Sequence, residues 1–167
     1  MTGLPRPRVI IMTISDSASR GDREDLSGPA ARKVLEQLGC DVLEVVVFPD
    51  EMRTIQESLL GYCQAGGADL VVTTGGTGLG PRDVTPEATA AVIQKEVPGV
   101  AELMRQQGIK KTPRAALSRA KVGVRNRTLI INLPGSVKGV QESLAAIIDI
   151  LPHALEIISG NSVRCGE

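Results

Sequence analysis

Aromatic side chains are almost absent from this sequence, which has one Tyr, one Phe and no Trp among 167 residues. Proteins that bind single-stranded nucleic acid stack its bases on aromatic rings, so the side chains for that function are missing. Net charge is absent too, because 19 Lys and Arg residues balance 19 Asp and Glu residues. Without an excess of positive charge, we expect neither a nucleic acid nor a membrane surface as a partner.

Side chains that bind soft metals are also few. The three cysteines, Cys40, Cys63 and Cys165, are scattered, and His153 is the only histidine. No CxxC pair is present, which excludes a disulfide framework or thiolate metal site and indicates a reducing compartment. His153 lies in an apolar segment late in the chain, so we expect a structural role rather than a place in a Ser-His-Asp triad.

Long apolar runs are missing as well. No stretch approaches the roughly 20 residues of a membrane span, and the first residues lack the pattern of a signal peptide. The content of 42% hydrophobic and 23% charged residues is typical of a globular protein. We therefore expect a soluble, cytoplasmic protein that folds as a single domain over residues 1–167.

Apolar, β-branched segments alternate with segments of helical periodicity. Strands are predicted at residues 8–15, 41–48, 69–74 and 127–135. Helices are predicted at about 27–38, 52–65, from 85 onward, at 101–107 and at 137–159, with Pro152 expected to kink or divide the last one. This alternation predicts an α/β fold: a single doubly wound, mostly parallel sheet with helices on both faces. In such sheets ligands bind at the carboxyl ends of the strands.

A glycine-rich stretch, VVTTGGTGLGPRD at residues 71–83, follows the third predicted strand and precedes a helix. Gly75 and Gly80 have the spacing of a Walker motif, but Pro-Arg follows where Lys-Ser or Lys-Thr is needed, and GxGxxG does not fit either. The remaining hypothesis is a nest of backbone N–H groups that binds an anion, with the Thr74 and Thr77 hydroxyls beside it. A plain turn and a flexible linker are the alternatives.

Two acids stand just beyond strand ends, Asp50 after the second strand and Asp83 at the close of the glycine-rich stretch. Two carboxylates beside a phosphate would suit Mg²⁺, which prefers oxygen ligands and usually shares them with phosphates. The alternative for either residue is a turn or helix cap, and Asp50 has the sequence context of an N-cap.

Positive charge is concentrated between residues 105 and 127, which include eight Lys and Arg residues and no acid. Such a segment could bind a polyanionic small molecule, and a solvated face or an oligomer contact is an equal alternative. Within it, we expect Thr112-Pro113 and Ser118-Arg119 to lie nearest to a ligand.

Four blocks in order, FPDE, TTGGTG-LG-PRDVTPEAT, LSRA and IINLPGS, resemble the molybdopterin adenylyltransferase family of molybdenum cofactor biosynthesis, which includes the G domain of gephyrin. The resemblance covers nearly the whole chain. It implies a doubly wound α/β fold and a homotrimer, possibly a hexamer. It also implies Mg²⁺- and ATP-dependent transfer of AMP to the terminal phosphate of molybdopterin, with release of pyrophosphate. The product would be handed to a molybdate-inserting enzyme.

The family's two essential acids correspond to Asp50 and Asp83, which would also hold Mg²⁺. Binding of substrate and nucleotide is assigned to residues of the matching motifs: Asp16, Ser17, Gly75, Gly76, Thr77, Gly78, Arg82, Ser118, Arg119, Asn132, Pro134, Gly135 and Ser136. A phosphate nucleophile is ionised near neutral pH, so no general base is required. The competing hypotheses are a protein that binds molybdopterin without turning it over and, with less support, an oligomeric scaffold.

Overall fold

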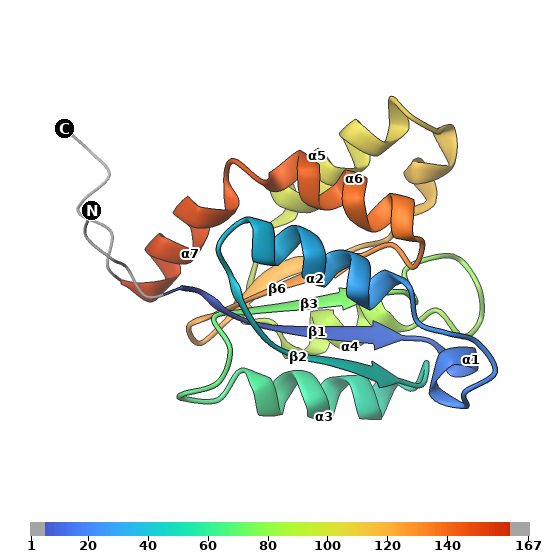
Figure 1. Cartoon of the computed structure of the whole chain (residues 1–167), viewed down its shortest axis with the longest axis horizontal. Helices are drawn as coiled ribbons and strands as arrows, with labels where there is room; N and C mark the ends of the chain where they lie inside the picture. Colours follow the sequence, from blue (N-terminus) through green and yellow to red (C-terminus); the bar gives the residue numbers. More distant parts are fainter. Residues whose placement is uncertain (1–5, 161–167) are drawn as a thin grey trace.

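The computed structural model describes residues 6–160, so Cys165 lies outside the described part. These residues form one six-stranded sheet in the order β2-β1-β3-β6-β5-β4 (Figure 1). The strands are β1 (Arg8–Ile14), β2 (Asp41–Phe48), β3 (Leu70–Thr74), β4 (Lys95–Glu96), β5 (Val122–Arg125) and β6 (Thr128–Leu133). The first three and β6 are parallel, while β5 and β4 are antiparallel to their neighbours. The predicted, mostly parallel α/β sheet is confirmed.

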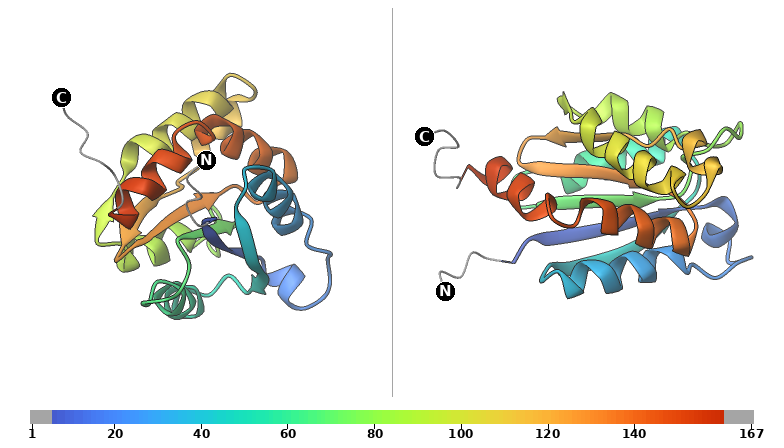
Figure 2. Two further views of the ribbon diagram at one scale, coloured as in Figure 1. Left: turned by 60° about the vertical axis from the view of Figure 1, so that its left-hand side comes forward. Right: turned by 90° about the horizontal axis from the view of Figure 1, so that it is seen from above.

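Helices cover both faces of this sheet, as predicted. On one face lie α2 (Ser27–Gln37), α5 (Pro98–Ile109), α6 (Val137–Ile147) and α7 (Leu151–Ser159), and on the other lie α3 (Met52–Tyr62) and α4 (Thr85–Val92). Figure 1 shows α2 and α6 above the strands and α3 below them, and the turned views in Figure 2 show the same layers. Among the described residues, no helix is long and apolar enough to cross a membrane.

The strand sequences explain this double burial. In β1, Val9 and Ile11 pack into the core under α2 and α6, whereas Ile10, Met12 and Ile14 pack into the core under α3 and α4. Successive side chains of a strand point to opposite faces, so a strand covered on both sides must be apolar at consecutive positions. Both cores are almost entirely aliphatic, as the scarcity of aromatic residues requires.

The structure departs from the predicted elements in four places. A short helix, α1 (Asp16–Ser19), occupies part of the expected first loop, and a 3₁₀ turn, η1 (Pro113–Leu117), follows α5. The strands β4 and β5 were not predicted, because two and four residues give too short a pattern. Helix α5 begins at Pro98, three residues before the predicted start at residue 101, because the first position of a helix needs no N–H donor and accepts proline.

The predicted division of the last helix is confirmed. Helix α6 ends at Ile147 and α7 begins at Leu151, with Pro152 in its first turn. A proline ring inside a continuous helix would clash with the preceding turn, and at the start of a new helix it does not. Likewise α2 is followed by Gly39, whose φ of 82° lies in the left-handed region that favours glycine.

Candidate active site

The carboxyl ends of the four parallel strands lie at one edge of the sheet. Backbone hydrogen bonds join them: Ser15 N donates to Phe48 O (2.8 Å), and Gly75 N donates to Leu133 O (3.1 Å). The Thr74 hydroxyl donates to Pro134 O at 2.8 Å. The loops that follow β1, β2, β3 and β6 are therefore neighbours, which is the position where doubly wound sheets bind ligands.

The glycine-rich loop after β3 has a backbone that only glycine accommodates. Gly75 and Gly76 have φ values of 101° and 66°, so both lie in the left-handed region. A Cβ on Gly75 would stand 2.3 Å from Ile14 O, and one on Gly76 would stand 2.3 Å from the Thr85 hydroxyl. The flexible-linker alternative is excluded, because this loop is packed tightly between β1 and α4.

Arg119 fastens the far side of the same loop. Its Nε donates to Gly78 O (2.7 Å), its Nη2 donates to Asp83 O (2.7 Å), and its Nη1 pairs with the Glu87 carboxylate. Its backbone N–H also donates to Thr77 O at 3.0 Å. Arg119 was predicted to bind substrate, and in this structure its side chain is engaged with the loop backbone. It therefore orders the loop.

Asp83 is tied to the loop that it ends. Its Oδ2 accepts a hydrogen bond from Gly80 N at 2.7 Å, and a Cβ on Gly78 would stand 2.9 Å from the same oxygen. The side chain is partly exposed. One carboxylate oxygen thus closes the turn, so the turn-forming alternative for Asp83 holds without excluding a second role for its other oxygen.

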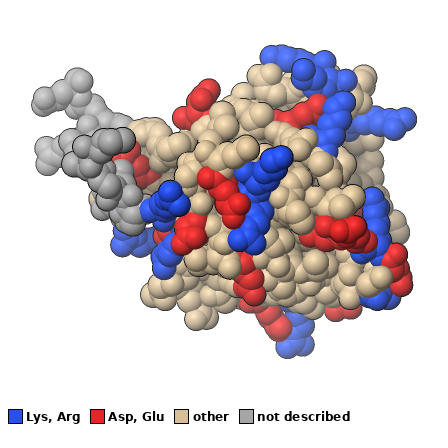
Figure 3. Space-filling view, viewed as in Figure 1, with Lys and Arg blue, Asp and Glu red and all other residues tan. Residues whose placement is uncertain are grey.

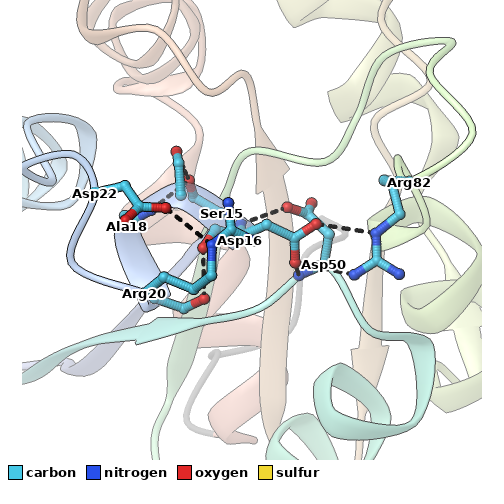
Figure 4. Close-up of polar contacts among 9 residues, drawn as sticks. Ser15, Asp16, Ala18, Arg20, Asp22, Asp50 and Arg82 are labelled. Carbon is cyan, nitrogen blue, oxygen red and sulfur yellow. Dashed lines mark hydrogen bonds and ion pairs between the residues drawn. The ribbon is translucent and has the colours of Figure 1, made fainter.

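Asp50 does not cap a helix, contrary to the alternative suggested by its context. The N-cap of α3 is Glu51, and no side chain caps that helix end. Instead Asp50 Oδ2 accepts from Asp16 N at 2.8 Å, and Asp50 N donates to Asp16 Oδ1 at 3.0 Å. Arg82 then donates to both Asp16 oxygens at 2.9 Å (Figure 4). These three residues connect the loops after β1, β2 and β3.

The two acids of this cluster differ in pKa. The hydrogen bond from Arg82 lowers the pKa of Asp16, and the backbone N–H of Asp50 adds to the effect. Burial raises the pKa of Asp50, and the negative charges of Asp16 and Asp83 raise it further, against the opposing backbone hydrogen bond and Arg82. Asp50 is therefore a partly buried carboxylate that makes no ion pair within 4 Å among residues 6–160, although Arg82 acts on it at longer range.

The fit of this site to Mg²⁺ follows from its oxygen atoms. Within residues 6–160, no three acidic, His or Cys side chains gather into a metal site, so a cage made only of protein ligands is absent. Mg²⁺ needs no such cage, since it usually takes one or two carboxylates together with waters and substrate phosphates. Asp50 and Asp83 influence each other electrostatically, and the buried Thr85 hydroxyl beside Asp50 lacks a hydrogen-bond partner. The residues present fit the ion.

A cavity of about 250 Å³ opens beside this edge, between α5, η1 and α6. Four residues that were predicted to bind substrate contribute to its lining: Ser118, Asn132, Pro134 and Ser136. Its charged lining residues are Arg105, Arg114, Lys138 and Glu142, and Lys138 pairs with Glu142 at 3.9 Å, which leaves the two arginines as the excess positive charge. An anionic ligand of small size would suit this cavity.

The side chains of two lining residues, Asn132 and Ser136, already make hydrogen bonds within the protein. The Asn132 side chain is fully buried, where its Oδ1 accepts from Lys121 N (3.1 Å) and its Nδ2 donates to the Thr73 and Thr89 hydroxyls (2.9 Å each). Ser136 caps α6 by accepting from Gly139 N at 3.0 Å. Asn132 thus has no free polar atom for a ligand and shapes the cavity wall.

The positively charged segment does not act as one surface. Figure 3 shows Lys and Arg side chains gathered where α5 ends and η1 follows, the part of the segment that holds Lys110, Lys111 and Arg114. By contrast, Arg125 donates to Val92 O, and Arg127 pairs with Ser159 O at the amino-end edge of the sheet. The segment up to Arg119 thus lies near the candidate site, and Arg125 and Arg127 lie away from it.

A second, larger cavity of about 710 Å³ lies at the opposite edge of the sheet. None of the predicted site residues lines it. Its charged lining residues are Arg6, Arg8, Asp69, Arg127 and Glu156, of which Arg8 and Asp69 pair with each other at 3.1 Å. The larger cavity and the predicted site residues therefore lie at opposite edges of the sheet. We give priority to the carboxyl-end edge, because the unpaired carboxylate, the glycine loop and the unpaired hydroxyl are all there.

Sequence reasoning did not identify the Thr85 side chain as part of this site. Helix α4 begins at Thr85, as predicted, with Val84 at the cap position, and the Thr85 hydroxyl is buried against the glycine loop. Asp25 was missed too: it accepts from the Thr13 hydroxyl at 2.7 Å and from Gly28 N at 3.0 Å, which anchors the start of α2 to β1. Neither role has a sequence signal, because both depend on contacts between distant segments.

The fold and this edge define a class: doubly wound α/β proteins that bind a ligand at the carboxyl ends of their parallel strands. Residues 10–153 match the model of a family described as a probable molybdopterin binding domain. This chain belongs to that molybdopterin-binding family, and the resemblance seen in the sequence is confirmed.

Named relatives share most of the chain. A molybdopterin adenylyltransferase of Helicobacter pylori is 45% identical over 159 residues, which cover 94% of this chain and 90% of that protein. A molybdopterin adenylyltransferase of Escherichia coli K12 is 40% identical over 171 residues, covering 94% and 88%. The crystal structure of the molybdopterin biosynthesis enzyme MoaB from Thermus thermophilus superposes with a TM-score of 0.88 at 51% identity, covering 92% of this chain and 97% of that one.

Proposed function

We propose that the protein is a nucleotidyltransferase that transfers AMP from ATP to the terminal phosphate of molybdopterin and releases pyrophosphate. The observation that carries this proposal is the meeting of Asp50, Asp83 and the glycine loop at one strand edge. The relatives named as molybdopterin adenylyltransferases match over most of their own length, which supports the same reaction here.

The glycine loop is proposed to hold the phosphates of ATP. Its backbone approaches other groups closely because no Cβ intervenes at Gly75, Gly76 or Gly78. Backbone N–H groups that are fixed before the ligand arrives stabilise charge on transferring phosphoryl groups without reorganisation. Arg119 keeps the loop in that arrangement through its bonds to Gly78 O and Asp83 O.

Asp50 and Asp83 would hold Mg²⁺ together with the phosphates. The ion would supply neutralisation of the negative charge on the phosphates and the leaving pyrophosphate. Asp16 fixes Asp50 by the two reciprocal hydrogen bonds, and Arg82 fixes Asp16. The molybdopterin phosphate attacks the α-phosphorus; the bond to the bridging oxygen breaks, and pyrophosphate leaves with that electron pair. No protein group has to remove a proton.

Molybdopterin is proposed to occupy the 250 Å³ cavity. Arg105 and Arg114 line this cavity, and their charges would favour an anionic phosphate there. The Thr74 hydroxyl bond to Pro134 O connects this cavity wall to the glycine loop, so the two substrates would meet at the sheet edge.

The remaining assignments extend this proposal. We propose a single domain over residues 1–167, a cytoplasmic location, a homotrimer or hexamer, and hand-over of the product to a molybdate-inserting enzyme. The exposed Leu43 on the edge strand β2 supports an assembly, because that strand has a neighbour on one side only. A protein that only binds molybdopterin is the alternative, since Asp83 also has a turn-closing role.

Pyrophosphate release from ATP, Mg²⁺ and molybdopterin tests the reaction. Asp50→Asn keeps an acceptor for Asp16 N and removes the charge, so we expect release at least a hundredfold slower, on the order of the loss of one electrostatic contact in other enzymes. Asp22→Asn, at an exposed acid paired with Arg20, is the control and should act as the wild type. Equal release by wild type and Asp50→Asn, with intact molybdopterin binding, would establish the binding-only alternative.

A further inference from the structure

The Thr85 hydroxyl is buried and has no hydrogen-bond partner among the described residues. Other buried threonines do have partners: Thr74 donates to Pro134 O, Thr128 donates to Ala68 O, and Thr89 accepts from Asn132. Leaving a buried hydroxyl unpaired costs free energy that a valine would avoid. A polar atom kept in such a position indicates a partner that joins from outside the chain.

The unpaired hydroxyl is directed at the glycine loop and at Asp50. A Cβ on Gly76 would stand 2.3 Å from Thr85 Oγ1 and 3.0 Å from Asp50 Oδ1, so both oxygens lie against the same side of the Gly76 α-carbon. Thr85 N donates to Gly76 O at 3.2 Å, which holds the side chain there. Asp50 Oδ1 also remains available, since the bond from Asp16 N is made to Oδ2.

We propose that Thr85 is a nucleotide-binding residue, whose hydroxyl donates a hydrogen bond to a phosphate oxygen of Mg-ATP beside Asp50. The inference rests on the proposed adenylyl transfer, because that reaction places triphosphate at the glycine loop. A phosphate oxygen is an acceptor only, and the Thr85 hydroxyl is a donor beside Asp50. Gly76 is then required for a further reason, because any side chain there would collide with the Thr85 hydroxyl and crowd Asp50 Oδ1.

The test compares Thr85→Val, Thr85→Ser and the control Thr128→Val. Valine keeps the shape of threonine without the hydroxyl, and serine keeps the hydroxyl. Each purified protein is titrated calorimetrically with Mg²⁺ and an ATP analogue that cannot be cleaved between its α- and β-phosphates, and thermal unfolding is recorded without ligand.

We expect Thr85→Val to bind the analogue about tenfold more weakly than wild type, while Thr85→Ser binds it nearly as well. Without ligand, Thr85→Val should unfold at the same or a higher temperature, because it loses an unpaired polar group. Thr128→Val should unfold at a lower temperature with unchanged affinity, because it breaks the 2.7 Å bond to Ala68 O far from the site.

Three results would overturn the inference. One is wild-type affinity in Thr85→Val, another is failure of Thr85→Ser to restore binding, and the third is a loss of thermal stability in Thr85→Val like that of Thr128→Val. The last would mean that the hydroxyl has a partner within the protein. If the wild type itself binds no analogue, the proposed function fails; if only the Thr85 variants behave contrary to expectation, the proposed function stands and this inference falls.

Discussion

At the scale of single residues, Asp16 organises the site more than either predicted acid. It exchanges two hydrogen bonds with Asp50 and accepts two from Arg82, so it links three loops that are distant in sequence. Asp50 keeps an oxygen beside Thr85 and Gly76. Asp16, which pairs with Arg82, thus positions Asp50. Asp50 is the acid with an oxygen that remains available to a ligand.

The raised pKa of Asp50 leads to a pH prediction. As pH falls through that raised pKa, Asp50 takes up a proton and loses the charge that binds the ion, so activity should fall at a higher pH than an ordinary Asp would give. Arg82 lowers the pKa of Asp50, so Arg82→Gln should move this acidic limb to still higher pH. The profile of kcat/KM against pH, which reports ionisations of the free enzyme, measures the shift. Arg53→Gln, at an exposed pair on α3, should leave the limb in place, and an unmoved limb in Arg82→Gln would contradict the account.

Asn132 leads to a stability prediction. Asn132→Leu would remove three hydrogen bonds at a fully buried position and leave Lys121 N–H unpaired. We expect unfolding in urea to show a loss of about 2–4 kcal/mol. Ser136→Ala removes only the cap of α6 and should cost about 1 kcal/mol. A loss in Asn132→Leu no larger than in Ser136→Ala would show that the Asn132 network is dispensable for folding.

At the scale of elements, the glycine loop after β3 combines left-handed backbone angles with close packing against other groups. Substitutions of Gly39, outside the loop, and Gly76, within it, distinguish the cost of the backbone angle from the cost of a collision. Gly39→Ala alters a residue with φ of 82° and nothing within 4 Å of its new Cβ, so it should cost about 1–2 kcal/mol. Gly76→Ala has the same backbone cost and a collision with Thr85, so its unfolding free energy should fall further and nucleotide binding should be lost. Nucleotide affinity in Gly76→Ala equal to that in Gly39→Ala would contradict this view of the loop.

Helix α3 is joined to strand β2 by Tyr62, whose hydroxyl donates to Glu44 at 3.1 Å. Burial and this bond raise the pKa of Tyr62 to about 12. The folded state holds the phenolic proton more tightly than the unfolded state, so this contribution to stability is present below about pH 10 and is lost as pH rises toward 12. With one Tyr and no Trp in the chain, ultraviolet absorbance of the phenolate reports on Tyr62 alone.

Glu44→Gln provides the comparison for that titration. It removes the negative charge, so the native titration should shift to lower pH. The midpoint of the native titration in Glu44→Gln should still lie above the midpoint for tyrosine in the unfolded chain, because burial is the largest cause of the raised pKa of Tyr62. A native midpoint in the wild type near that of an unfolded tyrosine would show that Tyr62 is not held against β2.

At the scale of the whole molecule, the sequence predicted the parts that depend on short-range pattern. Buried parallel strands such as Arg8–Ile14 and Leu70–Thr74 are apolar at every position or nearly so, and the rule for parallel sheets then placed their polar carboxyl ends together. Glycines and Pro152 marked loops and helix ends correctly. These signals are local, and the fold class follows from their alternation.

The remaining features depend on contacts between distant segments. The edge strand Lys95–Glu96 is too short to have a periodicity, and Arg119 was expected at the substrate although it faces the loop backbone. Nothing local to Asp50 reveals that it exchanges two hydrogen bonds with Asp16, 34 residues away, and that the N-cap position of α3 is Glu51. The sequence motifs identified the segments that form the site. They did not distinguish the residues that position the loops from the residues that would bind a ligand.

The position of bound nucleotide tests the central claim most directly. A crystal structure with Mg²⁺ and an uncleavable ATP analogue should show phosphate oxygens about 2.7–3.2 Å from backbone nitrogens of the loop at Gly76–Gly78, since Gly75 N already donates to Leu133 O. The same structure should show the ion beside Asp50 and Asp83. An analogue bound in the 710 Å³ cavity at the opposite edge of the sheet, with no phosphate at the glycine loop, would contradict the account.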